Sequence, residues 1–272
     1  DGPAPEPSRV RLAWFGDAIA IKDPTAAELR AQTQANVLML GQQQEIALGI
    51  MATALVGLAA QCGPHEGETP RFTILSGIPS DLPNADLFDK TAAAIPSAQV
   101  VHLGDGQAKL AAAVGAVAAE VERRSAEPDM EHPPIYLAVF DLGRFKSLKK
   151  PEDEFSFGRK DENKPVEPGK LFGTILRDGP ALGVHVIAWC DTYANLSRAL
   201  DRQAVREFDG KVLFQMSGND SSQIIDSPAA SKLGLHRALF CSEEQGRMEK
   251  FRPYGIPDAA WLASAKERLA RR

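Results

Sequence analysis

Short apolar runs alternate with longer amphipathic segments along most of this chain. Apolar runs bounded by turn residues predict four β-strands, at residues 36–40, 71–76, 135–140 and 183–189. Helical spacing of apolar residues predicts helices at 46–61, 86–94, 107–124 and 171–178. Strands that alternate with helices indicate an α/β domain with a mainly parallel central sheet and helices on its faces. The strand runs show little polar alternation, as expected of strands that are buried on both faces.

The N-terminal part of the chain carries weaker signals. Residues 1–9 are polar and proline-rich, which predicts a linker. Residues 10–21 alternate weakly around Gly16-Asp17, which predicts a hairpin with its turn at that dipeptide. The sequence Asp23-Pro24-Thr25 then predicts the start of a short helix.

The C-terminal part predicts a peripheral hairpin and a helix. Residues 211–216, 238–242 and 248–253 are hairpin-like, and residues 254–272 predict a turn and a basic amphipathic helix that starts at Pro257-Asp258. The expected division is a linker (1–9), one domain (10–253) and a connector helix (254–272). The most charged stretch, residues 149–170, predicts a solvated loop, and a loop that docks a partner is the alternative.

Composition narrows the class of protein. Of 272 residues, 44% are hydrophobic and 25% charged, values that are ordinary for a soluble domain. The polar start predicts no signal peptide, and the absence of an initial methionine leads us to expect a piece of a longer protein. No apolar stretch is expected to span a membrane, since the longest, residues 46–60, predicts a short buried helix.

Cysteine spacing and charge exclude further classes. Cys62, Cys190 and Cys241 form neither a metal-binding pattern nor an even disulfide set, which indicates a reduced, cytoplasmic setting. The net charge of −5 gives no overall attraction to nucleic acid.

The junction between the first strong strand and its helix has the outline of a phosphate-binding loop. Such a loop, G-x-x-x-x-G-K-S/T, needs its second glycine for backbone approach, its lysine for phosphate charge and its hydroxyl for magnesium. The candidate nucleotide loop runs through Gly41, Gln42, Gln43, Gln44, Glu45, Ile46, Ala47 and Leu48. Ile46, Ala47 and Leu48 therefore stand where the glycine, lysine and hydroxyl are required.

Two features bear on residual nucleotide binding at this loop. Backbone N–H groups at the start of a helix still offer a partial anion site. Glu45, however, places a carboxylate where phosphate would lie, and it also suits the positive end of the helix dipole. We therefore interpret Glu45 as a built-in replacement for phosphate and expect no bound cofactor.

Four stretches of the chain resemble sequences of the FtsK/SpoIIIE family, and they occur in the same order as in that family. The family belongs to the FtsK–HerA group and has a RecA-like P-loop NTPase fold. The four stretches are residues 36–61, 110–124 with the following strand, 176–191 and 210–226, and together they span most of residues 10–252. The long helix ends in Glu120-Val121-Glu122-Arg123-Arg124, which resembles the family's helix that ends in E-x-R-R. Similar domains occur in tandem in the EccC and EssC ATPases of type VII secretion.

The resemblance implies ATP and magnesium as cofactors. However, this sequence departs from the family pattern at the residues that bind or act on them. Asp141 stands at the Walker B aspartate, and Leu142 replaces the glutamate that activates water. Cys190 stands at the sensor position, where the family has glutamine. Lys211 is kept in the fourth stretch, while Gln215 stands where arginine is common. Asp141 is therefore interpreted as a relic that caps a turn.

Other polar residues are interpreted structurally. His185 is expected to be a core histidine with one hydrogen bond, and Cys190 a buried thiol that lacks a base. Residues 217–222 are rich in hydroxyl and amide groups, and a turn with a capped helix explains them without a ligand.

The expected function is a degenerate, non-hydrolysing ATPase module of a larger multi-ATPase protein that moves DNA or protein. Its partners by resemblance are sibling ATPase domains, a ring oligomer in the intact protein and a protein substrate, with no membrane contact by this segment. One alternative is an active ATP-dependent DNA translocase. The other is a receptor domain for a substrate peptide, as in type VII secretion, which a contiguous apolar groove would favour.

Overall fold

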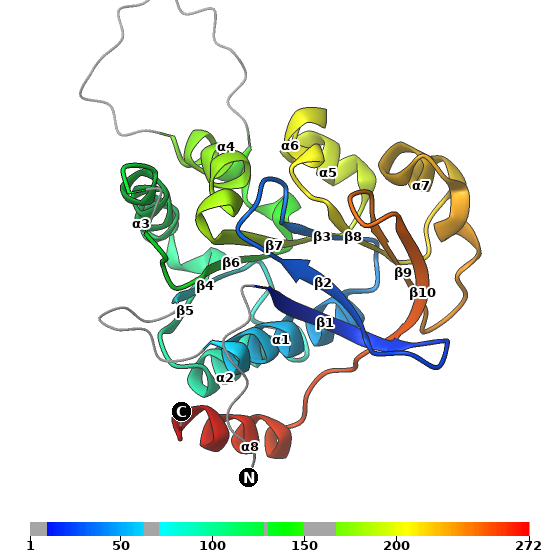
Figure 1. The fold of residues 1–272 in the computed structure, drawn as a ribbon, viewed down its shortest axis with the longest axis horizontal. Helices are drawn as coiled ribbons and strands as arrows, with labels where there is room; N and C mark the ends of the chain where they lie inside the picture. The colour runs from blue at the N-terminus through cyan, green and yellow to red at the C-terminus, as the bar shows by residue number, and fades with distance from the viewer. Residues whose placement is uncertain (1–9, 63–70, 128–129, 150–166, 272) are drawn as a thin grey trace, which may run out of the picture.

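A single ten-stranded sheet organises the computed structural model, which describes residues 10–62, 71–127, 130–149 and 167–271 (Figure 1). The strand order is β2-β1-β10-β9-β8-β3-β7-β6-β4-β5. The strands are β1 Arg11–Ala18, β2 Thr25–Leu29, β3 Val37–Leu40, β4 Arg71–Ser76, β5 Ala98–His102, β6 Ile135–Phe140, β7 Val184–Cys190, β8 Gly210–Leu213, β9 Ala238–Ser242 and β10 Arg247–Pro253. The α-helices are α1 Gln44–Gln61, α2 Leu87–Ala94, α3 Gln107–Ser125, α4 Pro168–Asp178, α5 Tyr193–Ala199, α6 Arg202–Arg206, α7 Gly218–Ile225 and α8 Ala259–Ala270.

The parallel half of the sheet confirms the α/β expectation. Strands β8, β3, β7, β6, β4 and β5 pair in parallel, with β3 between β7 and β8. All residues of β3, β6 and β7 are buried, which explains why these strands read as continuous apolar runs. The four predicted strands and four predicted helices are present, with their ends shifted by a few residues. Two parallel strands were not predicted as such: β5 was missed, and β8 was assigned to a hairpin.

The hairpin expected within residues 10–21 is wrong. β1 continues through Gly16, which pairs with Pro253 of β10, and the turn to β2 comes after Ala18. A Cβ atom at Gly16 would lie 2.0 Å from the Arg252 carbonyl oxygen, so this glycine permits close approach of two strands and marks no turn. The short helix expected at residues 23–25 is also wrong. Thr25 begins strand β2 and is fully buried, a position that suits a β-branched side chain.

The antiparallel strands β9, β10, β1 and β2 extend the parallel sheet beyond β8, and this extension is strongly curved. The predicted β9–β10 hairpin is present, and it joins β8 on one side and β1 on the other. At the far end of this extension, β2 returns toward β8: a Cβ atom at Gly210 would lie 3.5 Å from the Ala27 Cβ atom. The curl encloses apolar side chains of β1 and β2 together with those of β8, β9 and β10 in one core cluster.

Helices cover both faces of the sheet (Figure 1). Helices α1, α2 and α8 contribute to the core cluster on one face, and α3, α4, α5 and α7 to the cluster on the other. The predicted C-terminal helix begins where expected, because the Asp258 side chain accepts a hydrogen bond from the Trp261 backbone N–H. It packs on α2 and α1, while its role as a connector stays a prediction.

Helix α1 is apolar around its whole circumference. By length and composition, its 18 residues could cross a membrane, so the expectation that no stretch is long enough is wrong on that criterion. In this fold 61% of the helix is buried, packed against β1 and the core of the domain. The absence of a polar face therefore reflects its central position. The charged loop expected at 149–170 lies mostly outside the described residues, and α4 already begins at Pro168.

Candidate functional site at the carboxyl edge of the sheet

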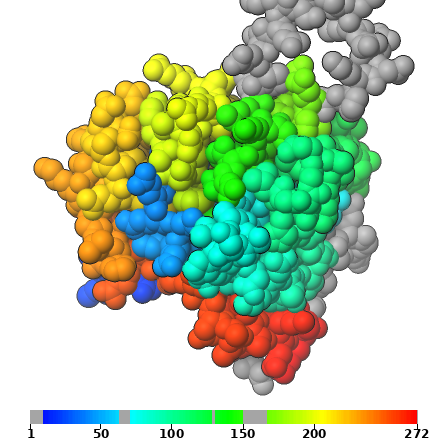
Figure 2. Space-filling model, turned by 180° about the vertical axis from the view of Figure 1, so that it is seen from behind, coloured from blue at the N-terminus to red at the C-terminus, as the bar shows by residue number. Residues whose placement is uncertain are grey.

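The carboxyl ends of three parallel strands bring the sequence-predicted residues together, and a fourth strand adds Phe214. Gly41 follows β3, Asp141 follows β6, Cys190 ends β7 and Phe214 follows β8. Open α/β sheets bind their ligands at this edge. Figure 2 looks onto it, with the blue surface of the β3–α1 junction among the green, yellow and orange surfaces of later segments.

Gly41 is held tightly by its neighbours. Its backbone N–H donates to the Cys190 carbonyl at 3.1 Å, and its carbonyl accepts a hydrogen bond of 3.1 Å from the Trp189 indole N–H. Its φ is +130°, and an added Cβ atom would lie 2.8 Å from the Phe214 Cβ atom. Glycine is therefore required here by backbone conformation and packing alone, and its N–H group is already occupied.

The β3–α1 connection is much shorter than a phosphate-binding loop. β3 ends at Leu40 and α1 begins at Gln44, so only Gly41, Gln42 and Gln43 lie between them. A P-loop places its glycine-rich segment between strand and helix, with room for a phosphate inside. Here the Gln44 N–H donates to the Gln42 carbonyl, and the Ala47 N–H donates to the Gln43 carbonyl.

The replaced Walker A positions face the protein interior. Ala47 and Leu48 are buried in the core cluster with α1, and Ile46 packs against it. A lysine at position 47 would point into the core. Glu45 is exposed, and the structure gives its side chain no hydrogen bond or ion pair with the described residues. No contact of Glu45 in the structure supports its interpretation as a replacement for phosphate, which stays a prediction.

Asp141 occupies an unusual backbone position beyond β6. Its φ of 67° and ψ of 58° are left-handed, and it precedes the short turn Leu142–Arg144. The expectation that its side chain caps this turn is wrong, because the side chain accepts no capping hydrogen bond there. Leu142 is fully buried in the cluster that also holds Leu40 and Leu196. The residue in place of the catalytic glutamate therefore serves as a core side chain.

The electrostatic environment of Asp141 disfavours its ionised form. Burial and the nearby Asp191 carboxylate together raise the pKa of Asp141 to about 6, although Arg144 opposes both effects. Arg144 donates to the Gly77 carbonyl at 2.7 Å. Asp191 accepts two hydrogen bonds from the Asn195 amide, at 2.8 and 3.0 Å. Asp191 is thus held in place beside Asp141 by Asn195.

We expect Asp141→Asn to stabilise the protein above about pH 7 by about 1–2 kcal/mol. A raised folded-state pKa means that the folded protein holds the proton more tightly than the unfolded chain, so stability falls as pH rises from about 4 to about 6. A two-unit shift corresponds to about 3 kcal/mol, which we reduce because Asp141 is partly exposed.

Urea unfolding at about pH 8 and about pH 4 measures this difference. Most of the stabilisation should be lost at the lower pH, where the folded state carries protonated Asp141 and the unfolded chain is only partly ionised at this position. Asp81→Asn, at an exposed position, is the matched control and should change stability by less than about 0.5 kcal/mol at either pH. Equal effects of Asp141→Asn at both pH values would contradict the assignment.

The Cys190 thiol at this edge and the His185 imidazole at the opposite end of β7 are both buried. Burial raises the pKa of the Cys190 thiol to about 12, so this sensor-position residue stays protonated. His185 bonds through Nδ1 to the Ala35 carbonyl at 2.7 Å, and burial lowers its pKa to about 4. Both agree with the structural interpretation of these residues.

The remaining polar residues from the sequence analysis support local structure. Lys211 donates to Glu243 at 2.7 Å, and the Gln215 side chain accepts from the Gly234 N–H at 3.0 Å. Ser217 caps α7 by accepting from the Asp220 N–H. The Asp191–Asn195 pair was missed by sequence reasoning; its only signal was a carboxylate directly after a predicted strand.

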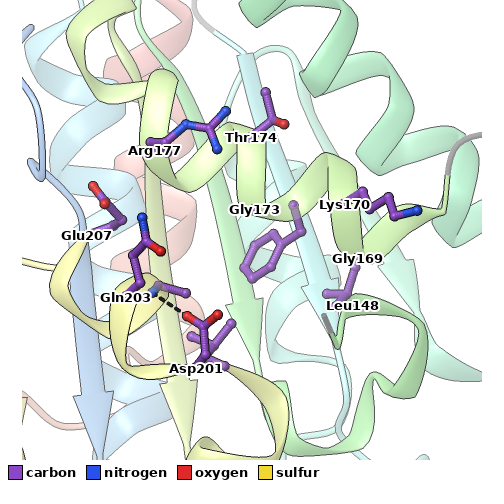
Figure 3. Close-up of a pocket in the computed structure, with 12 residues that line it drawn as sticks. Leu148, Gly169, Lys170, Gly173, Thr174, Arg177, Asp201, Gln203 and Glu207 are labelled. Carbon is purple, nitrogen blue, oxygen red and sulfur yellow. Dashed lines mark hydrogen bonds between the residues drawn. The ribbon is translucent and has the colours of Figure 1, made fainter. Parts of the chain in front are cut away.

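Three cavities lie away from this edge. One of about 340 Å³ lies between α4 and α6, with Lys170, Thr174 and Arg177 on one side and Gln203 and Glu207 on the other (Figure 3). A groove of about 870 Å³ lies between β1, α1 and α8, and one of about 370 Å³ lies beside β4 and β5. None of the three is lined by residues 41–48, Asp141 or Cys190.

Solved structures share this fold. The chain superposes on EssC (ATPases 2 and 3) from Geobacillus thermodenitrificans with a TM-score of 0.65, at 14% identity over 100% of this chain and 50% of that one. Thermomonospora curvata EccC (ATPases 2 and 3), in complex with a signal sequence peptide, gives 0.66 at 14% identity, over 100% and 49%. The pCW3 conjugation coupling protein TcpA with ATPγS gives 0.66 at 14% identity, over 98% and 72%.

The chain thus spans about half the length of the EssC and EccC structures. No family model and no curated protein matches the sequence. At this identity the superpositions establish the fold, which is that of the FtsK/HerA-type P-loop ATPases, as the sequence resemblance predicted.

Proposed function

We propose that this chain is a nucleotide-free, non-hydrolysing module of a larger FtsK/SpoIIIE-type ATPase that serves translocation. The observation that carries the proposal is the three-residue connection between β3 and α1, which leaves no loop to surround a phosphate. The Gly41 N–H is taken by Cys190, and Ala47 and Leu48 are buried where the lysine and hydroxyl are needed.

The residues present do not fit magnesium and ATP. Asp141 keeps a carboxylate at the magnesium position, but burial and the neighbouring Asp191 carboxylate raise its pKa to about 6. Leu142 cannot activate water, and Cys190 carries a protonated thiol instead of a sensor amide. Together with the lysine and the hydroxyl, which positions 47 and 48 lack, four groups that serve phosphoryl transfer are therefore replaced at one edge.

A module of this kind would act through contacts with sibling domains. The EssC and EccC structures contain ATPases 2 and 3, and the chain covers about half of each, which is consistent with one module of a tandem array. The module would pack against a catalytically intact sibling domain and hold or regulate it. It would do so in the cytoplasm, which is where the matching part of T. curvata EccC lies by its name. Linker and connector roles for residues 1–9 and 254–272 belong to this proposal.

Phosphate release from ATP by the purified chain tests the proposal. We expect release at the background rate, unchanged by Asp141→Asn. Release that is lost in Asp141→Asn and kept in the exposed control Asp81→Asn would overturn it and would restore the alternative of an active translocase. Comparison of the two variants separates activity of this chain from a contaminating ATPase.

The groove between β1, α1 and α8 favours a second candidate function, a receptor for a substrate peptide. Its walls are mostly apolar and include Trp14, Val56, Trp261 and Leu269, and Trp261 is 42% exposed. Apolar grooves of this kind accept one face of an amphipathic helix. The T. curvata EccC structure holds a signal sequence peptide, which supports peptide binding as a use of this fold.

A titration with an amphipathic helical peptide, followed by tryptophan fluorescence, tests the receptor function. Ala265→Arg places a long charged side chain in the groove and should abolish the change in fluorescence. Ala263→Arg, an exposed position on the same helix that does not line the groove, should leave it intact. Equal binding by both variants would rule out the groove.

A further inference from the structure

The groove between β1, α1 and α8 carries an acidic and a basic residue on its mostly apolar walls. They are Asp23 and Arg268, and both line the groove, whose volume is about 870 Å³. Both residues are exposed, and neither side chain forms a hydrogen bond or an ion pair with another described residue. Both charges are therefore available to a partner that enters the groove.

Contacts along β1 place Asp23 at one end of the groove. At the start of the strand, the Leu12 N–H and carbonyl are hydrogen-bonded to the side chain of Gln61, the last residue of α1. Further along the strand, a Cβ atom added at Gly57 would lie 2.9 Å from the Trp14 ring. β1 therefore runs antiparallel to α1. Asp23 lies between β1 and β2, beyond the end of β1, and so at the end of the groove that is nearer the start of α1.

Arg268 lies at the opposite end of the groove. A Cβ atom added at Gly49, in the first half of α1, would lie 2.6 Å from the carbonyl carbon of Gly255, shortly before α8. From there α8 lines the groove within residues 261–269, while α1 lines it within residues 53–60. The two helices thus run in the same direction along the groove, and Arg268 lies near the end of α1.

The dimensions of the groove suit about two turns of a third helix. From residue 53 to residue 60, α1 rises about 10 Å. In the middle of the α8 wall, Ser264 and Ala265 are small and let a helix backbone come close. A helix in this position would meet the apolar walls with side chains at i, i+3, i+4 and i+7.

Building on the receptor function proposed above, we propose that the groove takes an amphipathic partner helix that runs antiparallel to α1 and α8. This helix carries acidic residues in its first turn and basic residues in its last turn. In the antiparallel orientation the first turn lies at Arg268 and the last turn at Asp23, so each end meets an opposite charge.

The dipole of the partner helix favours the same arrangement. Acidic groups stabilise the first turn of a helix, and basic groups stabilise the last turn. A partner helix with this stabilising pattern would meet like charges at both ends of the groove if it ran parallel to α1. The antiparallel orientation alone satisfies both the dipole of the partner and the charges of the groove.

Two synthetic peptides of equal composition test the proposed polarity, by titration of the wild-type chain followed through tryptophan fluorescence. Both are amphipathic helices of about 15 residues with one leucine-rich face. The first peptide has glutamates in its first turn and lysines in its last turn, and the second has these charges exchanged. We expect the wild type to bind the glutamate-first peptide more tightly.

Two variants of α8 separate recognition by the groove from the helix propensity of the peptides. Arg268→Glu and Lys266→Glu change the charge equally, but Lys266 is exposed and does not line the groove. The preference for the glutamate-first peptide should fall by about threefold to tenfold in Arg268→Glu, the range for an exposed charge pair that is reversed. Lys266→Glu should keep the preference of the wild type. Helix propensity is the same for every protein variant, so it cancels in this comparison.

The outcomes distinguish failure of the polarity from failure of the receptor function. An equal preference in the wild type and in Arg268→Glu would overturn the proposed polarity, as would tighter binding of the lysine-first peptide by the wild type. In either case, binding that Ala265→Arg abolishes would leave the receptor function standing. Binding of neither peptide would refute the receptor function itself.

Discussion

Arg124→Met is expected to lower the free energy of unfolding by about 3–5 kcal/mol, the cost typical of breaking a buried ion pair by removing one partner. Arg124 is 0% exposed at the end of α3. It donates to Glu120 at 2.9 Å, to the Leu182 carbonyl at 2.9 Å and to the Pro133 carbonyl at 2.8 Å. The side chain therefore joins α3 to the segments that enter β6 and β7.

Glu120 is the charge that Arg124 balances. Burial opposes ionisation of Glu120, but hydrogen bonds from Arg123, Arg124 and Arg71 outweigh it and lower the pKa to about 2. A lowered folded-state pKa stabilises the protein above about pH 4.5, and this contribution is lost as pH falls toward 2. Removal of Arg124 leaves the Glu120 carboxylate with fewer partners and takes a hydrogen-bond donor away from the Leu182 and Pro133 carbonyls.

Urea unfolding at neutral pH measures the effect of Arg124→Met. Arg123→Met is the matched control, since Arg123 also contacts Glu120 but its side chain is 40% exposed; we expect a loss of about 1 kcal/mol or less. Similar losses of unfolding free energy in the two variants would contradict the claim that the buried Arg124 contributes more to stability than the exposed Arg123. The helix end Glu120-Val121-Glu122-Arg123-Arg124, which is part of the sequence resemblance, thus has a structural explanation in this chain.

Asn36→Ala is expected to cost about 3 kcal/mol. Asn36 is buried directly before β3, and its amide donates to the carbonyls of Leu176 at 3.0 Å and Glu207 at 2.8 Å. Its side-chain oxygen accepts from the Val186 N–H at 2.7 Å. One side chain thus connects β3 with β7 and with the ends of α4 and α6. Truncation leaves three backbone groups without their partner, and each unpaired buried group costs about 1–3 kcal/mol unless water reaches it.

The midpoint and slope of urea unfolding test this prediction. Asn219→Ala, at an exposed position in the first turn of α7, is the control and should change stability by less than about 0.5 kcal/mol. A loss below 1 kcal/mol for Asn36→Ala would mean that water replaces the amide.

The central strands could be predicted because their environment is uniform. β3, β6 and β7 are buried on both faces, so each is a continuous apolar run between turn residues. β5 was missed because it is a sheet edge with mixed exposure, and its short sequence alternates only weakly. β8 was assigned to a hairpin because its partner β3 lies far away in the sequence, and no local pattern reports a parallel pairing.

The errors near the N-terminus have a similar origin. Gly16 and the sequence at 23–25 carry the local signals of a turn and of a helix start, but tertiary contacts override both. Gly16 is small because Arg252 passes close to it, and Thr25 is a strand residue because β2 packs on β1.

The candidate site was predicted in outline only. Gly41, Asp141 and Cys190 could be assigned to one edge because they follow successive parallel strands. The early start of α1 at Gln44 was not predicted, since helical periodicity does not define a helix end. The pairing of Asp191 with Asn195, and its effect on the pKa of Asp141, depend on distances that no spacing in the sequence conveys.

Isothermal titration calorimetry of the purified chain with ATP and magnesium, beside a non-hydrolysable analogue, tests the central claim most directly. The short β3–α1 connection and the buried Ala47 and Leu48 predict no heat of binding up to millimolar nucleotide. Binding with micromolar affinity would contradict the account, because it would mean that the three-residue connection opens and holds phosphate through its backbone alone.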